Sequence, residues 1–246
     1  MLIDTNGIVL RTTRYRETSA IVNIYTDKLG LQTYIVNGLF GLKSKNKISF
    51  FQPLSLLNLV VYYRSTQNIK RIKELQWATL FSSIPFNVFK SSIALFITEV
   101  LNKSIKEEEP NEALFNFLYQ KIIELDEAEY SLANYLPFFL IDLSSYLGFK
   151  PMQNKTSQKS YFNLLQGQFV AGEIINKNQL NEYGSQLMLN LLNSASNQKE
   201  NLKLSREQRS DLLKVLVRYY QCHIENFGKI KSLPILEQIF NDLNKN

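Results

Sequence analysis

The sequence predicts an α+β protein of two domains, an N-terminal five-stranded β-barrel followed by an α-helical domain that carries a small β-hairpin. Apolar residues recur with the period of strands up to about residue 80 and with the period of helices from about Ser82 onward. A chain of 246 residues can bury two modest cores, and its 45% apolar content is typical of folded proteins. We therefore expect residues 1–82 to form the barrel and residues 83–246 the helical domain.

Five strands are expected in the first domain. They are runs rich in β-branched and aromatic residues, bounded by turn residues. The runs cover Ile8–Arg11, Ala20–Thr26, Leu31–Val36, Leu54–Tyr63 and Ile69–Trp77. The second and third are joined by Asp27-Lys28-Leu29-Gly30, a connection of hairpin length. Five strands without a long helical pattern between them indicate a small closed or nearly closed barrel.

The second domain shows helical spacing, with apolar residues at i, i+3, i+4 and i+7. Such patterns cover residues 93–101, 114–125, 136–147, 179–193, 206–225 and 233–243. Between the third and fourth of them, residues 150–160 are polar and without period. Two short runs then flank Gln166-Gly167, which predicts a hairpin over Tyr161–Val170.

The positive charge is concentrated in the first domain. Residues 1–80 carry eleven Lys and Arg against four Asp and Glu, a balance of +7. The remaining 166 residues carry 17 basic and 18 acidic groups, a balance of −1. This asymmetry favours a polyanionic partner over a generally basic, solvated surface.

The chain offers little for catalysis. Its one histidine, His223, removes most imidazole-based mechanisms and metal sites, and it is expected to pack on a helix beside Cys222. The acidic run at 107–109 precedes Pro110 and is expected to be a solvated loop. We therefore predict a protein that is not an enzyme and has no cofactor. A single cysteine, no signal peptide and no apolar run of membrane-spanning length predict a cytoplasmic protein without membrane association.

Binding residues are more abundant. Small basic barrels hold nucleic acid by neutralising phosphates and by stacking exposed aromatic rings on bases. The candidate DNA-binding residues are Arg11, Arg14, Arg16, Lys43, Lys45, Lys47, Arg64, Lys70 and Arg71. Lys43, Lys45 and Lys47 alternate, which would place three cations on one side of an extended loop, or they form a loop that is simply solvated. Tyr34, Tyr62 and Trp77 could stack on bases or pack in the barrel.

Several segments, in order along nearly the whole chain, resemble the bacterial DNA repair and recombination mediator family RecO. They are Gly7-Ile8-Val9-Leu10-Arg11-Thr12, Tyr15-Arg16-Glu17-Thr18-Ser19, Phe51-Gln52-Pro53-Leu54, Glu109-Pro110-Asn111-Glu112-Ala113-Leu114-Phe115, Tyr146-Leu147-Gly148-Phe149-Lys150-Pro151 and Lys231-Ser232-Leu233-Pro234-Ile235-Leu236. The resemblance implies an N-terminal oligonucleotide-binding (OB) barrel and a C-terminal helical domain. It further implies binding of single- and double-stranded DNA, annealing of complementary strands, and partnership with RecR. It also implies contact with the acidic C-terminal tail of single-stranded-DNA-binding protein and loading of the recombinase RecA.

The chain departs from the family pattern at one place. Many relatives carry a four-cysteine zinc module after the Gly-Phe-Lys-Pro segment, in the region of residues 148–175 here. Residues 150–175 contain no cysteine, so a thiolate site cannot form there, and we predict no structural zinc. Two other functions stay open on the residues alone: a helical scaffold that captures protein partners, with the barrel docking acidic peptides, and an RNA-binding barrel.

Overall fold

The computed structural model describes residues 1–41, 45–64, 66–129, 131–155, 157, 159–174, 176–197 and 202–242. For residues 45, 46, 196, 197, 241 and 242 it describes the backbone alone. The chain separates into two compact units, one made of 1–127 with 230–246 and the other of 128–229. These units are divided differently from the expected domains, because residues 83–127 and 230–246 belong to the same unit as the barrel. The boundary between residues 82 and 83 stays a prediction.

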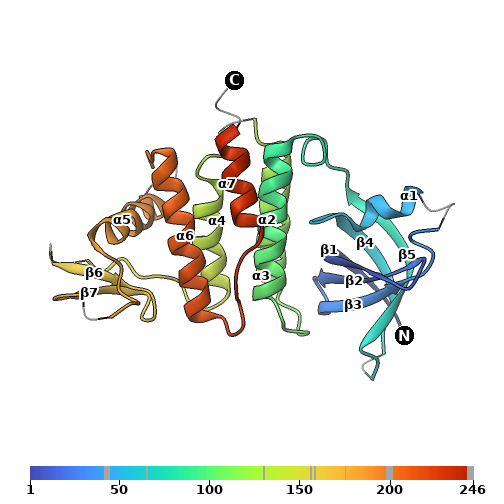
Figure 1. The fold of residues 1–246 in the computed structure, drawn as a ribbon. Helices are drawn as coiled ribbons and strands as arrows, with labels where there is room; N and C mark the ends of the chain where they lie inside the picture. The colour runs from blue at the N-terminus through green and yellow to red at the C-terminus, as the bar shows by residue number, and fades with distance from the viewer. Residues whose placement is uncertain are drawn as a thin grey trace. The chain divides into compact units, whose positions relative to one another are not determined.

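The barrel is closed by five strands in the order β1-β2-β3-β5-β4 (Figure 1). The strands are β1 (Leu2–Tyr15), β2 (Ser19–Thr26), β3 (Gly30–Val36), β4 (Leu56–Tyr62) and β5 (Ile69–Thr79). The predicted five-stranded barrel is confirmed, and its strand order is that of the OB fold. Short helices α1 (Lys45–Ile48) and η1 (Ser49–Phe51) join β3 to β4.

β1 is much longer than the predicted run because it pairs with two strands. Its first half is antiparallel to β4, and the stretch from Gly7 onward is antiparallel to β2. The register shifts between Val9 and Arg11, so Leu10 is a bulge residue without a partner on β2. The parallel pairing of β3 with β5 then closes the barrel. Side chains on the inner faces, among them Val9, Val22, Ile24, Leu57 and Val61, form its core.

β4 begins two residues later than predicted. Leu54 adopts a positive φ of 63° and its amide donates to the Val9 carbonyl, so it belongs to the turn that leads into the strand. Gly30 is also in the left-handed region, at φ 65°, and packs against the backbone of Glu108 and Glu109. A Cβ at Gly30 would lie 2.4 Å from the Glu109 carbonyl oxygen, so only glycine fits there.

Helices α2 (Val88–Ser104), α3 (Glu112–Glu127) and α7 (Ser232–Asp242) belong to the same compact unit as the barrel. The barrel connects to α2 through Ser82–Ile84, whose three amides donate to the carboxylate of Asp126 at 2.8–2.9 Å. The buried Lys90 ammonium donates to Ser83 Oγ and to the Asp126 carbonyl, both at 2.7 Å. Asp126 and Lys90 therefore fix this linker turn through its three amides and the Ser83 hydroxyl.

The second unit contains α4 (Tyr135–Tyr146), α5 (Glu182–Asn197), α6 (Arg206–His223) and the hairpin β6 (Ser160–Asn163) with β7 (Gln168–Ala171). The hairpin predicted over 161–170 is thus present, with its turn at Leu164–Gly167. Capping of α6 follows from its sequence: Ser205 and Gln208 form a capping box at its start. Among the described residues, no helix is long and apolar enough to cross a membrane.

Candidate nucleic-acid interface

The outer face of β1, β2, β3 and β5 carries two cross-strand rows of side chains. One row runs Thr13, Ile21, Ile35, Arg71, and the next runs Arg11, Asn23, Thr33, Ile69. We call these eight residues the barrel face. Three strand spacings separate the ends of each row, which is about 14 Å. The strand 2–3 face is also where OB folds bind oligonucleotides.

The barrel face combines three isoleucines with two arginines at diagonally opposite corners. Ile69 is half exposed, Arg11 and Arg71 are exposed, and the face carries no carboxylate among these eight positions. Tyr62 pairs with Arg71 on the neighbouring strand and is 49% exposed. Tyr15 lies two residues beyond Thr13 on β1 and is 40% exposed. Cations with exposed rings beside them are the combination that holds a single strand.

A second group of predicted residues gathers at the β1–β2 turn. The Arg14 guanidinium lies 5.2 Å from the centre of the Phe40 ring, and one of its nitrogens donates to the Glu17 carbonyl. Arg16, in the left-handed region at φ 56°, lies 5.2 Å from the centre of the Tyr15 ring. The Phe40 amide donates to the Thr18 carbonyl, which ties the segment after β3 to this turn. The ring contacts hold both arginines near the Tyr15 end of the barrel face.

The predicted extended loop over Lys43–Lys47 is wrong for its second half. The backbone of Lys45–Ile48 forms one helical turn, so the two-residue alternation of an extended chain does not apply to positions 45 and 47. Lys47 is exposed. Lys43 and the side chain of Lys45 lie outside the described residues, and their predicted contacts remain predictions.

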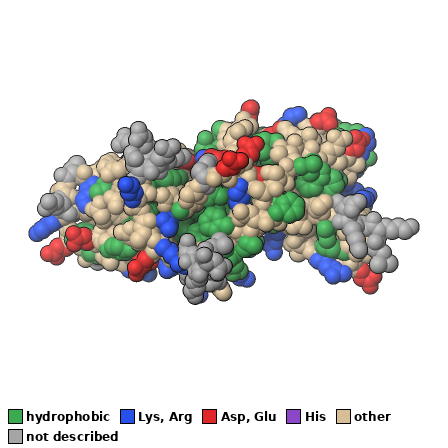
Figure 2. Space-filling view, turned by 90° about the horizontal axis from the view of Figure 1, so that it is seen from above, with side chains coloured by type: hydrophobic (Ala, Val, Ile, Leu, Met, Phe, Trp, Pro, Cys, Tyr) green, Lys and Arg blue, Asp and Glu red, His purple; other side chains and the backbone are tan. Residues whose placement is uncertain are grey.

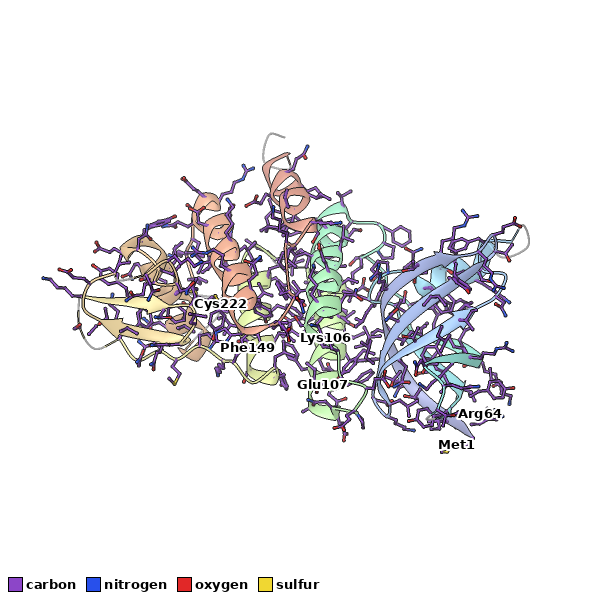
Figure 3. All side chains as sticks on the ribbon, turned by 60° about the horizontal axis from the view of Figure 1, so that its bottom comes forward. Met1, Arg64, Lys106, Glu107, Phe149 and Cys222 are labelled. Atoms are coloured by element: carbon purple, nitrogen blue, oxygen red, sulfur yellow. The ribbon has the colours of Figure 1, made fainter. Side chains whose placement is uncertain are left out.

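The remaining candidates lie at the end of the barrel that contains the N-terminus. Met1 and Tyr63 exchange backbone hydrogen bonds, and Arg64 follows at the exposed start of the β4–β5 loop (Figure 3). Lys70 differs from the other candidates because it is only 4% exposed, with its ammonium 5.3 Å from the Tyr63 ring centre. It pairs with Tyr34 on the inner side of the sheet. Lys70 therefore packs against Tyr63, and its predicted DNA contact stays a prediction.

The three aromatic residues that could either stack on bases or pack in the barrel, Tyr34, Tyr62 and Trp77, differ in their surroundings. Tyr34 is fully buried in the barrel core, and burial raises the pKa of its hydroxyl well above the ordinary value. Trp77 stacks on Phe50 with ring centres 4.5 Å apart. Tyr62 alone of the three is left largely exposed for stacking on a base.

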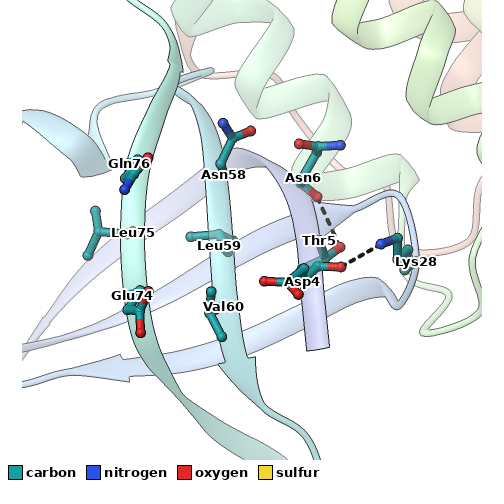
Figure 4. A pocket seen from close by; sticks show the side chains of 10 residues that line it. All are labelled: Asp4, Thr5, Asn6, Lys28, Asn58, Leu59, Val60, Glu74, Leu75 and Gln76. Atoms are coloured by element: carbon teal, nitrogen blue, oxygen red, sulfur yellow. Dashed lines mark hydrogen bonds between the residues drawn. The ribbon is translucent and has the colours of Figure 1, made fainter. Parts of the chain in front are cut away.

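A small pocket of about 320 Å³ on the outer side of β1, β4 and β5 has the opposite character (Figure 4). Amide side chains of Asn6, Asn58 and Gln76 line it in cross-strand register, together with the carboxylates of Asp4 and Glu74. Lys28 is the cation among its lining residues, and it donates to the Asp4 carbonyl at 2.7 Å. Two carboxylates against one engaged lysine make this pocket unsuited to a polyphosphate.

Cations are not confined to one continuous patch of the molecule. On the face seen in Figure 2, Lys and Arg side chains are interspersed with acidic and apolar ones. The acidic run predicted to be a solvated loop is exposed, but its backbone is fixed, because the Leu31 amide donates to the Glu107 carbonyl at 3.1 Å. Glu107 contributes, after burial, to raising the pKa of Tyr25 to about 12. These carboxylates therefore lie at the Leu31 end of β3, beyond the two rows of the barrel face.

His223 has a packing role, as its sequence context predicted. Its ring stacks on Phe149 with centres 5.0 Å apart, and Nε2 lies 2.8 Å from the Leu164 carbonyl oxygen. Burial raises the pKa of the neighbouring Cys222 thiol, the reverse of what a nucleophile needs (Figure 3). Within the described ranges, no group of three or more His, Cys, Asp or Glu residues could hold a metal ion.

Sequence reasoning missed the apolar part of the site. Ile21, Ile35 and Ile69 were assigned to strands, but nothing in their local pattern told which side of the closed barrel they occupy. The alternation along each strand could have found them once the inward-facing residues were known. Val22 and Tyr34 are fully buried, so their chain neighbours Ile21 and Ile35 face outward.

Comparison with known families decides the assignment. The model described as "Recombination protein O N terminal" matches residues 1–81, and "Recombination protein O C terminal" matches residues 85–234. The chain belongs to the RecO family. RecO membership places it in DNA repair and recombination. The resemblance seen in the sequence is thereby confirmed.

Curated RecO proteins match over the full length of the chain. The "DNA repair protein RecO" of Flavobacterium psychrophilum is 36% identical over 98% of this chain and 100% of its own length. Those of Bacteroides fragilis (strain ATCC 25285) and Phocaeicola vulgatus are 33% and 35% identical with the same coverage. A solved asparaginyl-tRNA synthetase of Entamoeba histolytica aligns over 91% of this chain and 56% of its own, at 13% identity and a TM-score of 0.27. A likeness at that level shows neither a shared fold nor a shared function.

Proposed function

We propose that this RecO protein binds single-stranded DNA on the barrel face and promotes annealing and recombinase loading without catalysing a reaction. The observation that carries the proposal is the pair of cross-strand rows, which place Arg11 and Arg71 at opposite corners of a surface that holds three isoleucines, with the exposed Tyr15 and Tyr62 beside it. Phosphates would be neutralised at the two corners, and bases would rest on the isoleucine side chains between them and on the tyrosine rings beside them.

The finer steps of the proposal follow the family. The chain would bind double-stranded as well as single-stranded DNA and bring complementary strands together by screening their phosphates. With RecR, and by contact with the acidic tail of single-stranded-DNA-binding protein, it would help load RecA on coated strands in the cytoplasm. Family membership supports these partners, and the near-neutral charge of residues 81–246 leaves room for protein contacts beside the basic barrel.

A salt titration of oligonucleotide binding tests the proposal. About five neutralised phosphates give a slope of log Kd against log salt of about 3.5, or about a hundredfold weaker binding between 50 and 200 mM salt. Arg11→Gln with Arg71→Gln should reduce that slope by about 1.4. Lys73→Gln, whose lysine pairs with Glu74 at 3.0 Å, is the matched control and should leave the slope unchanged.

An annealing assay tests whether the same arginines also support the joining of complementary strands. The Arg11/Arg71 variant should anneal complementary strands more slowly at equal protein concentration, while the Lys73 control anneals at the wild-type rate. An unchanged slope and rate in the double variant would remove the barrel face as the binding site. Tighter binding of RNA than of DNA of the same sequence would redirect the proposal to RNA.

A further inference from the structure

A groove of about 770 Å³ lies inside the first compact unit, beside the bulged part of β1. Its walls come from β1, η1, α2 and α7, all within that unit. Three apolar side chains on its lining are substantially exposed: Leu95 at 43%, Ile235 at 49% and Ile48 at 37%. Three cations, Arg11, Lys103 and Lys231, line it as well.

The bulge in β1 shapes this groove. The Leu10 carbonyl, which has no partner on β2, accepts a hydrogen bond from the side-chain amide of Asn102 on α2. The same amide donates to the Thr98 carbonyl at 2.8 Å, which fixes its orientation on the helix. On the opposite wall, Thr12 Oγ1 donates to the Phe51 carbonyl at 2.8 Å. The two walls are therefore tied to β1 on either side of Arg11.

The one carboxylate in the lining is already engaged. Glu99 accepts hydrogen bonds from the Lys231 and Ser232 amides, both at 2.8 Å, and from Ser232 Oγ at 2.7 Å. Burial alone would raise the pKa of Glu99, but these hydrogen bonds outweigh it and hold the pKa below its ordinary value. Glu99 therefore stays negatively charged at the start of α7, where a helix favours negative charge, and Lys103 also helps to lower its pKa. Three cations against this one carboxylate leave the lining with a net positive charge.

We propose that a single strand of DNA lying on the barrel face continues past Arg11 into this groove, where Lys103 and Lys231 contact its phosphates. Arg11 belongs both to the barrel face and to the groove lining, so the two surfaces are continuous. Sugars and bases would lie on the exposed Leu95 and Ile235 side chains of the same lining. The inference rests on the proposed function and extends the binding site from the barrel to α2 and α7.

Oligomer length separates the two surfaces. Wild-type protein is titrated with oligothymidylates of about 5 and about 20 nucleotides, near the lower limit and above the upper limit of OB site sizes. Lys103→Gln with Lys231→Gln should reduce the salt slope for the long oligomer by about 1.4 and leave the slope for the short one unchanged. Lys214→Gln, on a lysine 3.7 Å from Asp211 in α6, is the matched control.

Each outcome decides the inference. Equal long-oligomer slopes in wild type and double variant would overturn the groove path, while intact short-oligomer binding would leave the barrel proposal standing. Failure of wild-type protein to bind the short oligomer would instead contradict the barrel proposal. If the double variant keeps its long-oligomer slope but loses binding of a labelled peptide of Asp and Phe residues, the groove holds an acidic peptide and the path is wrong.

A second variant guards against misfolding of the first. Leu95→Glu places a carboxylate on the exposed floor without removing a buried side chain, and it should weaken long-oligomer binding while leaving the short oligomer unaffected. An unfolding midpoint equal to that of wild type shows that the fold is kept. A Leu95→Glu protein with wild-type affinity for the long oligomer would also overturn the groove path.

Discussion

The barrel and the β6–β7 hairpin are both built mainly from antiparallel strand pairs, yet they are stabilised in different ways. In the barrel, every strand has a neighbour on each side, so closure itself satisfies the backbone. The hairpin has only two strands of four residues, which is too little β-structure to be stable alone. Side chains from outside the hairpin must therefore satisfy its edges.

Those side chains can be named. Both oxygen and nitrogen of the Asn154 amide bond to the backbone of Phe169, at 2.8 and 3.3 Å, as a neighbouring strand would. On the other edge, Ser185 Oγ accepts from the Phe162 amide at 2.9 Å. The Phe162 ring is fully buried and packs edge-on against Phe169 and Tyr219.

Gly167 completes the contact of the hairpin turn with α6. It has φ 64°, and a Cβ there would lie 2.7 Å from the Tyr219 hydroxyl. Tyr219 in turn donates to the Phe149 carbonyl. The described residues offer no thiolate site, and aromatic packing joins the hairpin to α6. The comparison teaches that capped edges and aromatic packing can do for a two-stranded hairpin what closure does for the barrel.

The largest expected effect comes from emptying the hairpin core. Phe162→Ala should reduce the free energy of unfolding by about 3–5 kcal/mol, because a fully buried ring is replaced by a cavity. Hydrogen exchange should show the loss in 160–171 and not in the barrel strands. Leu165→Ala, at a 53% exposed position in the same turn, is the control and should change stability by less than about 0.5 kcal/mol. Uniform loss of protection in both regions would contradict the division into two units.

The linker of the barrel depends on a charge, whereas the hairpin depends on neutral groups. Burial would raise the pKa of Asp126, but the amides of Ile84, Ser82 and Ser83 outweigh it and lower the pKa below its ordinary value. A carboxyl whose pKa is lowered by folding adds stability above its unfolded value, about 3.9, and this is lost as pH falls through the folded pKa. Asp126→Asn should therefore cost about 1.5–3 kcal/mol near pH 7 and progressively less below about pH 4.

Chemical denaturation of wild type and Asp126→Asn between about pH 3 and pH 7 measures that difference. Asp211→Asn, at a partly exposed carboxylate in α6 near Lys214 and the Tyr183 hydroxyl, should cost less than about 1 kcal/mol across the range. A cost for Asp126→Asn that does not shrink in acid would show that the charge is not what the linker uses.

A smaller effect is expected from removing one edge cap. Asn154→Ala leaves the Phe169 amide and carbonyl without their partner, which should cost about 1–3 kcal/mol and raise hydrogen exchange at Phe169. Gln153→Ala, next in the chain, removes a side-chain amide that donates to the exposed Asn193 Oδ1 in α5 at 3.0 Å; it is the control and should have little effect. Equal exchange at Phe169 in both variants would exclude the cap.

The smallest expected effect is that of a metal chelator. If the hairpin is held as described, EDTA should leave the unfolding midpoint of the purified protein unchanged, and elemental analysis should find no stoichiometric zinc. One zinc ion bound per chain would contradict this and would require ligands other than those in residues 150–175.

The sequence by itself determined the five strands, most helices, the hairpin and the basic character of the first third, because these depend on local alternation and composition. It could not determine which basic side chains lie close together on one surface and which are buried. Arg71 joins Thr13 across strands far apart in the chain, Lys70 becomes buried, and Lys103 and Lys231 come to line one groove. Only barrel closure, the bulge at Leu10 and the packing of α7 beside α2 decide these positions, since each pairs residues that no local pattern connects.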